Sequence, residues 1–205
     1  MRRRPVAAVG LLVLLATPAW AGAPTDQLRQ TVEDVLRILN NPALKSPAKR
    51  EERRAELRRV VEPRFDFAET ARRALGRYWK DRTDEERRQF TDLFKDLLEQ
   101  TYTSRIETYK GERVVFGRES VDGDYATVRT KIIAGSDKEI PVDYRMLRRG
   151  DRWLVYDVVI EDVSLVDNYR SQFKEVIEAS SYPALVKRIK ARLEELEALG
   201  RAKAG

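Results

Sequence analysis

The stretch Lys138–Ile160, KEIPVDYRMLRRGDRWLVYDVVI, decides the fold. Apolar residues recur at every second position on both sides of Arg149-Gly150-Asp151, which is typical of two strands joined by a tight turn. We therefore expect an antiparallel hairpin with strands Lys138–Arg148 and Arg152–Ile160.

The second strand of this hairpin is apolar on both faces. Simple alternation predicts that one face carries Leu154, Tyr156, Val158 and Ile160, opposite Trp153, Val155 and Val159. A strand of this kind is central in its sheet. Either both faces are covered, or one is covered and the other lines a cavity.

A second period-two region precedes the first. Residues Arg113–Val121 and Tyr125–Ile133 flank Asp122-Gly123-Asp124 and predict another hairpin. Together the two hairpins predict a four-stranded antiparallel meander.

Helical signals fill the chain before the strands. Thr25 is a candidate cap for a first helix, and Ser46 with Pro47 for a second, strongly charged helix whose Lys and Arg run we interpret as a solvated face. Asp66 with Glu69 predicts a capped short helix closing at Gly76.

A long amphipathic helix is expected next. Thr83 with Glu86 forms a second capping box, and Phe90, Phe94 and Leu97 follow at helical spacing. This apolar stripe is read first as core, and alternatively as core on one side and ligand wall on the other.

After the meander, Ser164 predicts the start of a covering helix, and a last helix begins near Pro183. Glu161 and Asp162 precede Ser164 without the glycine that a calcium loop needs, so we interpret them as rim and turn residues. The chain thus reads as one α+β domain over residues 22–200 with a frayed tail at 201–205.

The first 21 residues read as a secretory signal peptide. Arg2, Arg3 and Arg4 precede an apolar run that is too short to span a membrane, and Ala19-Trp20-Ala21 predicts cleavage after Ala21. No cysteine follows for lipid attachment, so we expect an exported protein of the periplasm without a stable membrane anchor.

Composition excludes most catalytic classes. The chain has no His and no Cys, which removes Ser-His-Asp triads, Cys–His nucleophiles and the usual zinc sites. The formal charge of +6 includes the three signal arginines, so +3 remains, and no nucleic-acid partner is indicated. We predict no metal site and no catalytic residue.

An enzyme remains as an alternative hypothesis. Helices around an antiparallel sheet can form a cone, and Tyr–Asp isomerase chemistry needs no histidine. Tyr144, Tyr156, Asp143 and Asp157 could supply it, but only if Tyr144 and Tyr156 converge across strands. A ligand-free adaptor for envelope proteins is a third hypothesis.

The order of motifs resembles the MlaC, or toluene-tolerance, family of periplasmic phospholipid-binding proteins over nearly the whole exported chain. The segments that carry the resemblance are Phe65-Asp66-Phe67, Ala74–Trp79, Glu86–Tyr102, Ile140–Arg145, Trp153–Val158 and Glu161–Leu165. Two positions depart from the family, which often has Gly where this chain has Asp162 and Ser180-Ser181.

The resemblance implies an NTF2-like cone: a four-stranded antiparallel sheet wrapped by about six helices around an apolar cavity. It implies a carrier, not an enzyme, that shuttles phospholipid between an outer-membrane lipoprotein complex and an inner-membrane MCE-domain ABC transporter and so maintains outer-membrane lipid asymmetry. Phospholipid would be its cargo, with no cofactor. A related branch is associated with hopanoids, which stay open as an alternative cargo.

The apolar residues of these motifs are our candidates for the wall of the acyl-chain cavity. They are Phe90, Phe94, Leu97, Val142, Tyr144, Met146, Leu154, Tyr156, Val158, Ile160 and Phe173.

Overall fold

The computed structural model describes residues 23–135 and 138–202. The predicted signal peptide and residues 203–205 of the predicted tail lie outside them. Six α-helices and an antiparallel sheet confirm the α+β class. The elements are α1 (Ala23–Asn40), η1 (Pro42–Leu44), η2 (Pro47–Lys49), α2 (Arg50–Val61), η3 (Glu62–Arg64), α3 (Phe67–Leu75), η4 (Gly76–Trp79), α4 (Asp84–Ile106), β1 (Arg113–Asp122), β2 (Tyr125–Ala134), β3 (Lys138–Arg149), β4 (Arg152–Ile160), β5 (Val163–Ser164), α5 (Leu165–Ala179) and α6 (Tyr182–Ala202).

The sheet is a meander in the order β1-β2-β3-β4-β5, as predicted except for its last strand. Glu161 and Asp162 form a two-residue turn with φ of 48° and 65°, which lets Val163 pair back onto Ile160. Two residues in the left-handed region are what a type I′ hairpin turn requires. The acids predicted as turn residues therefore create a short fifth strand.

A β-bulge in β4 overturns the predicted alternation. Arg145 pairs with Asp157, but the next residue of β3, Met146, pairs with Val155, so Tyr156 is the extra residue. The bulge shifts the side-chain phase by one position. Trp153 and Val155 therefore share a face with Val158 and Ile160, whereas Leu154 and Tyr156 lie on the other face.

The helix starts follow local hydrogen bonding. Thr83 and Glu86 form the predicted reciprocal capping box, with bonds of 3.2 and 2.8 Å. The Asp66 carboxylate accepts from the backbone N–H of Glu69, as expected, and the helix ends at Gly76. Ser164 caps α5 as predicted, since its hydroxyl accepts from the backbone N–H of Asp167.

The first two predicted caps are not formed as expected, although Ser46 and Pro47 do take the cap and first positions of η2. Ser46 makes no side-chain capping bond, and Pro47 opens a short 3-10 turn, so α2 begins only at Arg50. Thr25 lies inside α1, where its N–H and hydroxyl both donate to Glu119 of β1. At Thr25, a long-range contact with β1 thus replaces the local capping bond that the sequence suggested.

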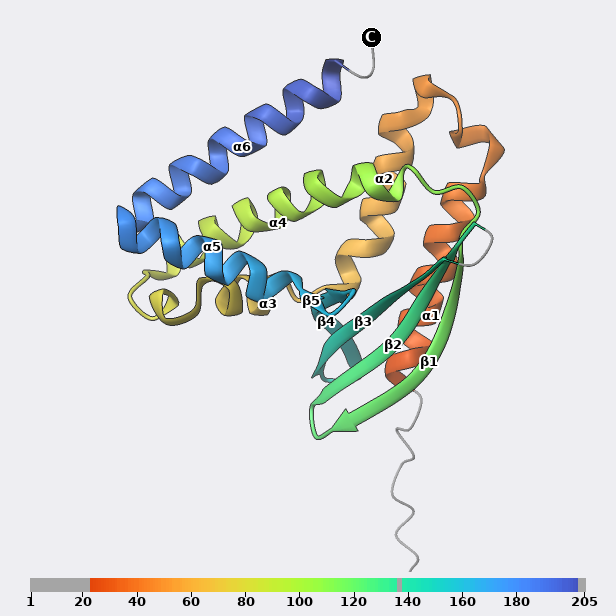
Figure 1. The fold of residues 1–205 in the computed structure, drawn as a ribbon, viewed down its shortest axis with the longest axis horizontal. Helices are drawn as coiled ribbons and strands as arrows, with labels where there is room; N and C mark the ends of the chain where they lie inside the picture. The colour runs from red at the N-terminus through yellow and green to blue at the C-terminus, as the bar shows by residue number, and fades with distance from the viewer. Residues whose placement is uncertain (1–22, 136–137, 203–205) are drawn as a thin grey trace, which may run out of the picture.

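The apolar core consists of two clusters rather than one. The first joins α3, α4, α5 and α6, and the second joins α1 to one face of the sheet. Figure 1 shows the same division, with α1 alongside the strands and α4, α5 and α6 extending away from them. We call these two parts the helical half and the sheet half.

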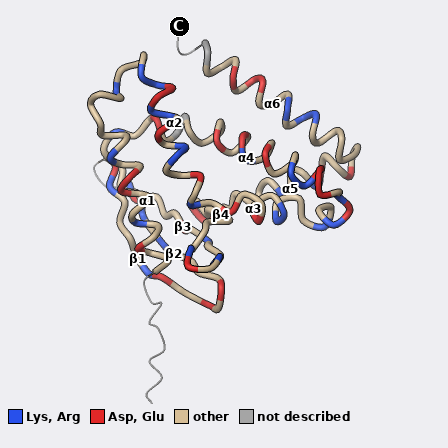
Figure 2. The backbone as a smooth tube through the Cα atoms, turned by 180° about the vertical axis from the view of Figure 1, so that it is seen from behind, with Lys and Arg blue, Asp and Glu red and all other residues tan. Residues whose placement is uncertain are grey.

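Charged residues of both signs are interspersed along the chain, including α2, α4 and α6 (Figure 2). No helix in the described part of the chain is long and apolar enough to cross a membrane.

Candidate functional site

The sheet face that carries α1 is sealed at one end and partly open at the other. Met146 and Val155 are fully buried at the sealed end, in a cross-strand row with Ala126. At the opposite end the paired residues Ile132 and Ile140 are only half-buried. An apolar face thus extends beyond the part that its own core covers.

Tyr144 lies where the buried part of this face gives way to the half-buried part. It pairs with Val128 on one side and Val158 on the other. Burial raises the pKa of its hydroxyl to about 12, yet part of its surface remains accessible. Tyr144 therefore marks the inner end of the candidate site, where the apolar face is still covered by the core.

Half-buried apolar residues also lie on three of the helices, α1, α2 and α4. Contacts of Leu28 and Val32 with the sheet cluster place α1 over this face. On the helices, the half-buried residues are Val32, Val35, Leu36 and Leu39 of α1, Val60 and Val61 of α2, and Leu98, Tyr102 and Ile106 of α4. Such a band of partly covered apolar surface is typical of a site for an apolar ligand.

The predicted stripe on α4 belongs to the helical half. Phe90 and Phe94 contact Phe173 of α5 edge to face, with ring centroids 5.7 and 5.2 Å apart. Both are fully buried. Leu97 belongs to the same cluster, as does Phe173. The reading of this stripe as core is therefore confirmed for these residues.

The structure divides the predicted wall residues into three groups. Phe90, Phe94, Leu97 and Phe173 are in the helical cluster. Val142, Tyr144, Met146, Val158 and Ile160 lie on the α1 face of the sheet. Leu154 and Tyr156 are on the opposite face, because of the bulge. That all of them line one cavity stays a prediction.

The geometry that an enzyme would need is not present at the two sheet tyrosines. Tyr156 lies under the guanidinium of Arg73, 4.1 Å from the ring centroid, and stacks edge to face on Tyr125. Tyr144 is on the other side of the sheet, and among the described residues neither hydroxyl bonds to a carboxylate. The convergence of Tyr144 and Tyr156 that isomerase chemistry requires is therefore excluded.

The buried carboxylate of Asp157 fixes the corner between sheet and helices. It accepts hydrogen bonds from the Ser164 hydroxyl at 2.7 Å and the Val166 N–H at 3.1 Å, and it pairs with Arg145 at 3.1 Å. The bulge turns Asp157 toward Arg145 and the start of α5. From the sequence, this acid was considered only as a catalytic group of the alternative enzyme. The local feature that could have indicated its role at this corner is the presence of an acid within an otherwise apolar strand.

Helices α2 and α4 meet through a row of ion pairs. Glu107 near the end of α4 accepts from Arg50 and Arg54 at 3.0 Å and pairs with Arg53 at 3.4 Å. Further along, Arg58 pairs with Glu99, and Glu62 of η3 with Lys95 at 3.1 Å. Positions 54, 58 and 62 thus face positions 107, 99 and 95 in antiparallel order. We call this contact the α2–α4 seam.

The seam corrects the interpretation of α2 as a helix with a solvated charge run. Its apolar partner is α1, and its links to α4 are made by long charged side chains. Burial raises the pKa of Glu107, but hydrogen bonds from Arg54 and Arg50 outweigh it, so the pKa is below its usual value. Glu107 is therefore a charged, well-paired anchor of the seam.

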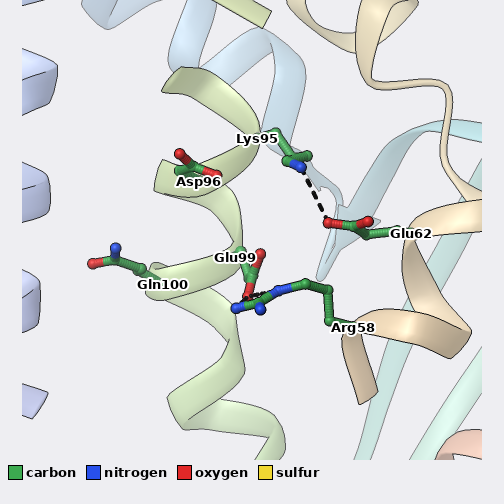
Figure 3. Close-up of a pocket in the computed structure, with 6 residues that line it drawn as sticks. All are labelled: Arg58, Glu62, Lys95, Asp96, Glu99 and Gln100. Carbon is green, nitrogen blue, oxygen red and sulfur yellow. Dashed lines mark hydrogen bonds and ion pairs between the residues drawn. The ribbon is translucent and has the colours of Figure 1, made fainter. Parts of the chain in front are cut away.

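The seam borders a hollow of about 380 Å³ (Figure 3). Its lining residues are Arg58, Glu62, Lys95, Asp96, Glu99 and Gln100. A second hollow of about 390 Å³ lies between the ends of α1 and α2. Neither is lined by a predicted wall residue. No group of three or more His, Cys, Asp or Glu in the described part of the chain could hold a metal ion.

The sequence also matches a known protein family. The sequence model of a family described as MlaC protein matches residues 29–191, most of the chain. The chain belongs to the MlaC family. The resemblance read from the sequence motifs is thereby confirmed.

Relatives of the MlaC family match at moderate identity. The intermembrane phospholipid transport system binding protein MlaC of Haemophilus influenzae is 27% identical over 56% of this chain and 56% of its own length. The match thus spans little more than half of that protein. The toluene tolerance protein ttg2D of Pseudomonas putida is 25% identical over 82% of this chain and 81% of its own.

A solved structure shares the fold. The phospholipid-binding protein of Ralstonia solanacearum, determined in complex with a phospholipid, superposes with a TM-score of 0.74. It is 27% identical and aligns over 85% of this chain and 98% of its own. The fold expected for an MlaC protein is therefore the fold observed.

The two departures from the MlaC pattern now have a structural description. Asp162 adopts a left-handed conformation, φ 65°, that glycine adopts without strain. Ser180 has φ −142°, which needs no glycine. Only the first departure puts a side chain into the left-handed region that favours glycine.

Proposed function

We propose that this protein is a periplasmic carrier that binds phospholipid and moves it between the two membranes of the cell envelope. The single observation that carries the proposal is the likeness to the Ralstonia protein, which was solved with a phospholipid and aligns over 98% of its length. The half-buried apolar band around Tyr144 supports it, because it offers acyl chains a surface that the protein core leaves partly uncovered.

The physics of transfer suits a shuttle. A phospholipid hides roughly 28 methylene groups, worth about 0.8 kcal/mol each, or on the order of 20 kcal/mol. Release into water is therefore negligible, and the cargo must pass directly from one apolar site to another. The proposed partners are an inner-membrane MCE-domain ABC transporter complex and an outer-membrane lipoprotein complex, and no catalytic step is involved.

In this proposal the cleaved chain, residues 22–200, acts as one lipid-binding domain. The acyl chains lie against Val142, Tyr144, Val158 and Ile160 of the sheet and the half-buried side chains of α1, α2 and α4. Phe90, Phe94, Leu97, Met146 and Phe173 support this wall from the two adjoining clusters.

Lipid extraction and native mass spectrometry of protein purified from cells test the proposal. We expect phospholipid at about one molecule per chain or more. Val158→Glu places a charge on the half-buried wall and should abolish lipid retention while circular dichroism stays unchanged. Val163→Glu, at an exposed position of β5, is the matched control and should retain lipid. Wild-type protein free of lipid, or loaded only with a hopanoid, would refute a phospholipid carrier.

A further inference from the structure

The hollow at the α2–α4 seam lies on the boundary between the two halves of the molecule. Arg58 and Glu62 come from α2 and η3, in the part that joins α1, whereas Lys95, Asp96 and Glu99 come from α4 of the helical half. Figure 3 shows Arg58 and Lys95 on the side of the α4 helix that faces α2, and Asp96 on another side. A ligand in this hollow would contact both halves at once.

Apolar residues lie directly beside the charged row on each helix. On α2, half-buried Val61 is the sequence neighbour of Glu62. On α4, half-buried Tyr102 lies three residues after Glu99, whereas Leu98 packs against the helical cluster. The seam therefore changes from charged to apolar across the width of one helix. An amphiphilic ligand with its polar end toward solvent would match this change.

The charges in the hollow are matched to a particular ligand class. Arg58 and Lys95 are cationic, and Glu62, Asp96 and Glu99 are anionic, which leaves one negative charge in excess. Two carboxylates are paired with the cations, but Asp96 has no ion-pair partner among the described residues. Burial raises the pKa of Asp96, although Lys95 opposes the effect. An unpaired carboxylate at the rim of a hollow favours a cationic group there.

We propose that the hollow at the α2–α4 seam holds the polar head group of the cargo, and that its preferred class is zwitterionic, a phosphate joined to an amine. The inference rests on the proposed function. Arg58 and Lys95 bind the phosphate, and Asp96 with Glu99 binds the ammonium group. A head group with a phosphate but no amine adds a negative charge to a site that already has one in excess, so anionic lipids bind less well.

Competition between two lipids tests the preference. Protein stripped of lipid is incubated with vesicles of equimolar phosphatidylethanolamine and phosphatidylglycerol with identical acyl chains, re-isolated, and analysed by mass spectrometry. We expect phosphatidylethanolamine to be enriched over the vesicle ratio. Asp96→Lys should shift the bound ratio toward phosphatidylglycerol by about threefold to tenfold, and by less at high salt.

Asp92→Lys is the matched control. Asp92 is exposed on the same helix one turn earlier, undergoes the same change of charge, and does not line the hollow. A shift in Asp92→Lys as large as that in Asp96→Lys would mean a general surface effect and would overturn the proposal, as would an unchanged ratio in both. Wild-type protein that takes up neither lipid would instead refute the carrier function itself.

Placement of the head group is measured separately. The chain contains no cysteine, so Gln100→Cys, at the edge of the hollow, can carry a single fluorophore. We expect stronger quenching by lipid with a nitroxide on its head group than by lipid with a nitroxide at its chain end. Gln172→Cys on α5 should show no such difference. Stronger quenching by the chain-end label at position 100 would overturn the proposal.

Discussion

Asp157 shows how one side chain can hold two parts of a fold together. Its carboxylate is 2% exposed and satisfies the Ser164 hydroxyl and the Val166 N–H, while its partner Arg145 is 41% exposed. Replacing it leaves buried donors unpaired, each costing about 1–3 kcal/mol. Asp157→Ala should therefore lower the free energy of unfolding by about 2–4 kcal/mol in urea titrations.

Asp143→Ala is the control for that measurement. Asp143 pairs with Arg129 on the same sheet face, but both side chains are far more exposed. Surface pairs contribute at most about 1 kcal/mol. Equal losses in the two variants would mean that burial of Asp157 is not what makes it important.

Asp162 offers the opposite prediction, a gain of stability. A non-glycine residue in the left-handed region destabilises the fold by about 1–2 kcal/mol. Replacement by glycine removes this strain, but the greater entropy of glycine in the unfolded chain offsets part of the gain. Asp162→Gly should raise the free energy of unfolding by about 0.5 kcal/mol, and the β-branched Asp162→Val should lower it by about 1 kcal/mol. A lower urea midpoint for Asp162→Gly would contradict the strain assigned to this turn.

Residue-level features were predictable where the cause is local. The capping bonds at Thr83 and Ser164 involve partners three residues away, so sequence spacing reveals them. The bulge at Tyr156 depends on how β4 pairs with β3, and no spacing within β4 encodes it. That single residue moved Tyr156 and Leu154 off the predicted wall and placed Asp157 against Arg145.

At the scale of elements, α2 was the helix least well predicted. A run of Lys and Arg looks the same in sequence whether it faces water or a row of carboxylates. The partners Glu99 and Glu107 lie on α4, more than 40 residues away in each pair. The existence of the helix could therefore be predicted, but its role in the seam could not.

Glu107 makes this element sensitive to pH. The pKa of Glu107 in the folded protein is below the ordinary value, so the folded state binds fewer protons at this group than the unfolded state. Its contribution to the free energy of unfolding is therefore fully present above the unfolded pKa of about 4.3. It is lost as the pH falls through the folded pKa. Glu107→Gln should cost about 1–3 kcal/mol at pH 7, because three arginines lose a buried anionic partner. The difference from wild type should shrink toward pH 3 in urea titrations.

Glu51→Gln serves as the control on the same seam. Glu51 pairs with Arg54 but is 84% exposed, so its replacement should cost little at either pH. A Glu107→Gln penalty that stays constant from pH 7 to pH 3 would contradict the role of the charged carboxylate.

For the candidate wall, the burial of the residues could be predicted, but their arrangement in space could not. Apolar periodicity identified residues that are buried or half-buried in the structure, including Phe94 and Val158. It could not show that α4 packs on α5 and α6 rather than on the sheet, because an amphipathic stripe does not specify its partner. The wall residues consequently divide between the helical cluster and the two faces of the sheet.

At the scale of the whole molecule, the division into a helical half and a sheet half bears on how cargo enters. Neither hollow is lined by the predicted wall residues, and each half has a core of buried apolar side chains. An empty dry cavity of 500 Å³ would cost about 12 kcal/mol, comparable with the whole stability of a domain. We therefore expect acyl chains to enter as the two halves move apart along the α2–α4 seam.

Cross-linking the seam tests this motion. Arg58→Cys/Glu99→Cys introduces the only two thiols of the chain, and a bis-maleimide then joins the halves. The joined protein should fail to take up lipid from vesicles. The same variant capped with a mono-maleimide lacks the same two head-group contacts but leaves the two halves free to separate, so it should still take up lipid.

Arg192→Cys/Glu195→Cys, joined in the same way within α6, controls for the reagent. These residues form an ion pair on one helix, so their cross-link spans no boundary and should leave uptake unchanged. Normal uptake with the seam joined would show that cargo enters elsewhere.

The two edges of the sheet bear on how this chain avoids aggregation. An open edge strand presents unpaired backbone groups that invite pairing between chains. At one edge β5 is only two residues long and turns at once into α5. At the other, β1 is broken by a bulge at Gly117 and Arg118. Both edges are thus poor templates for a second chain, so the sheet can stay solitary while its apolar face remains available.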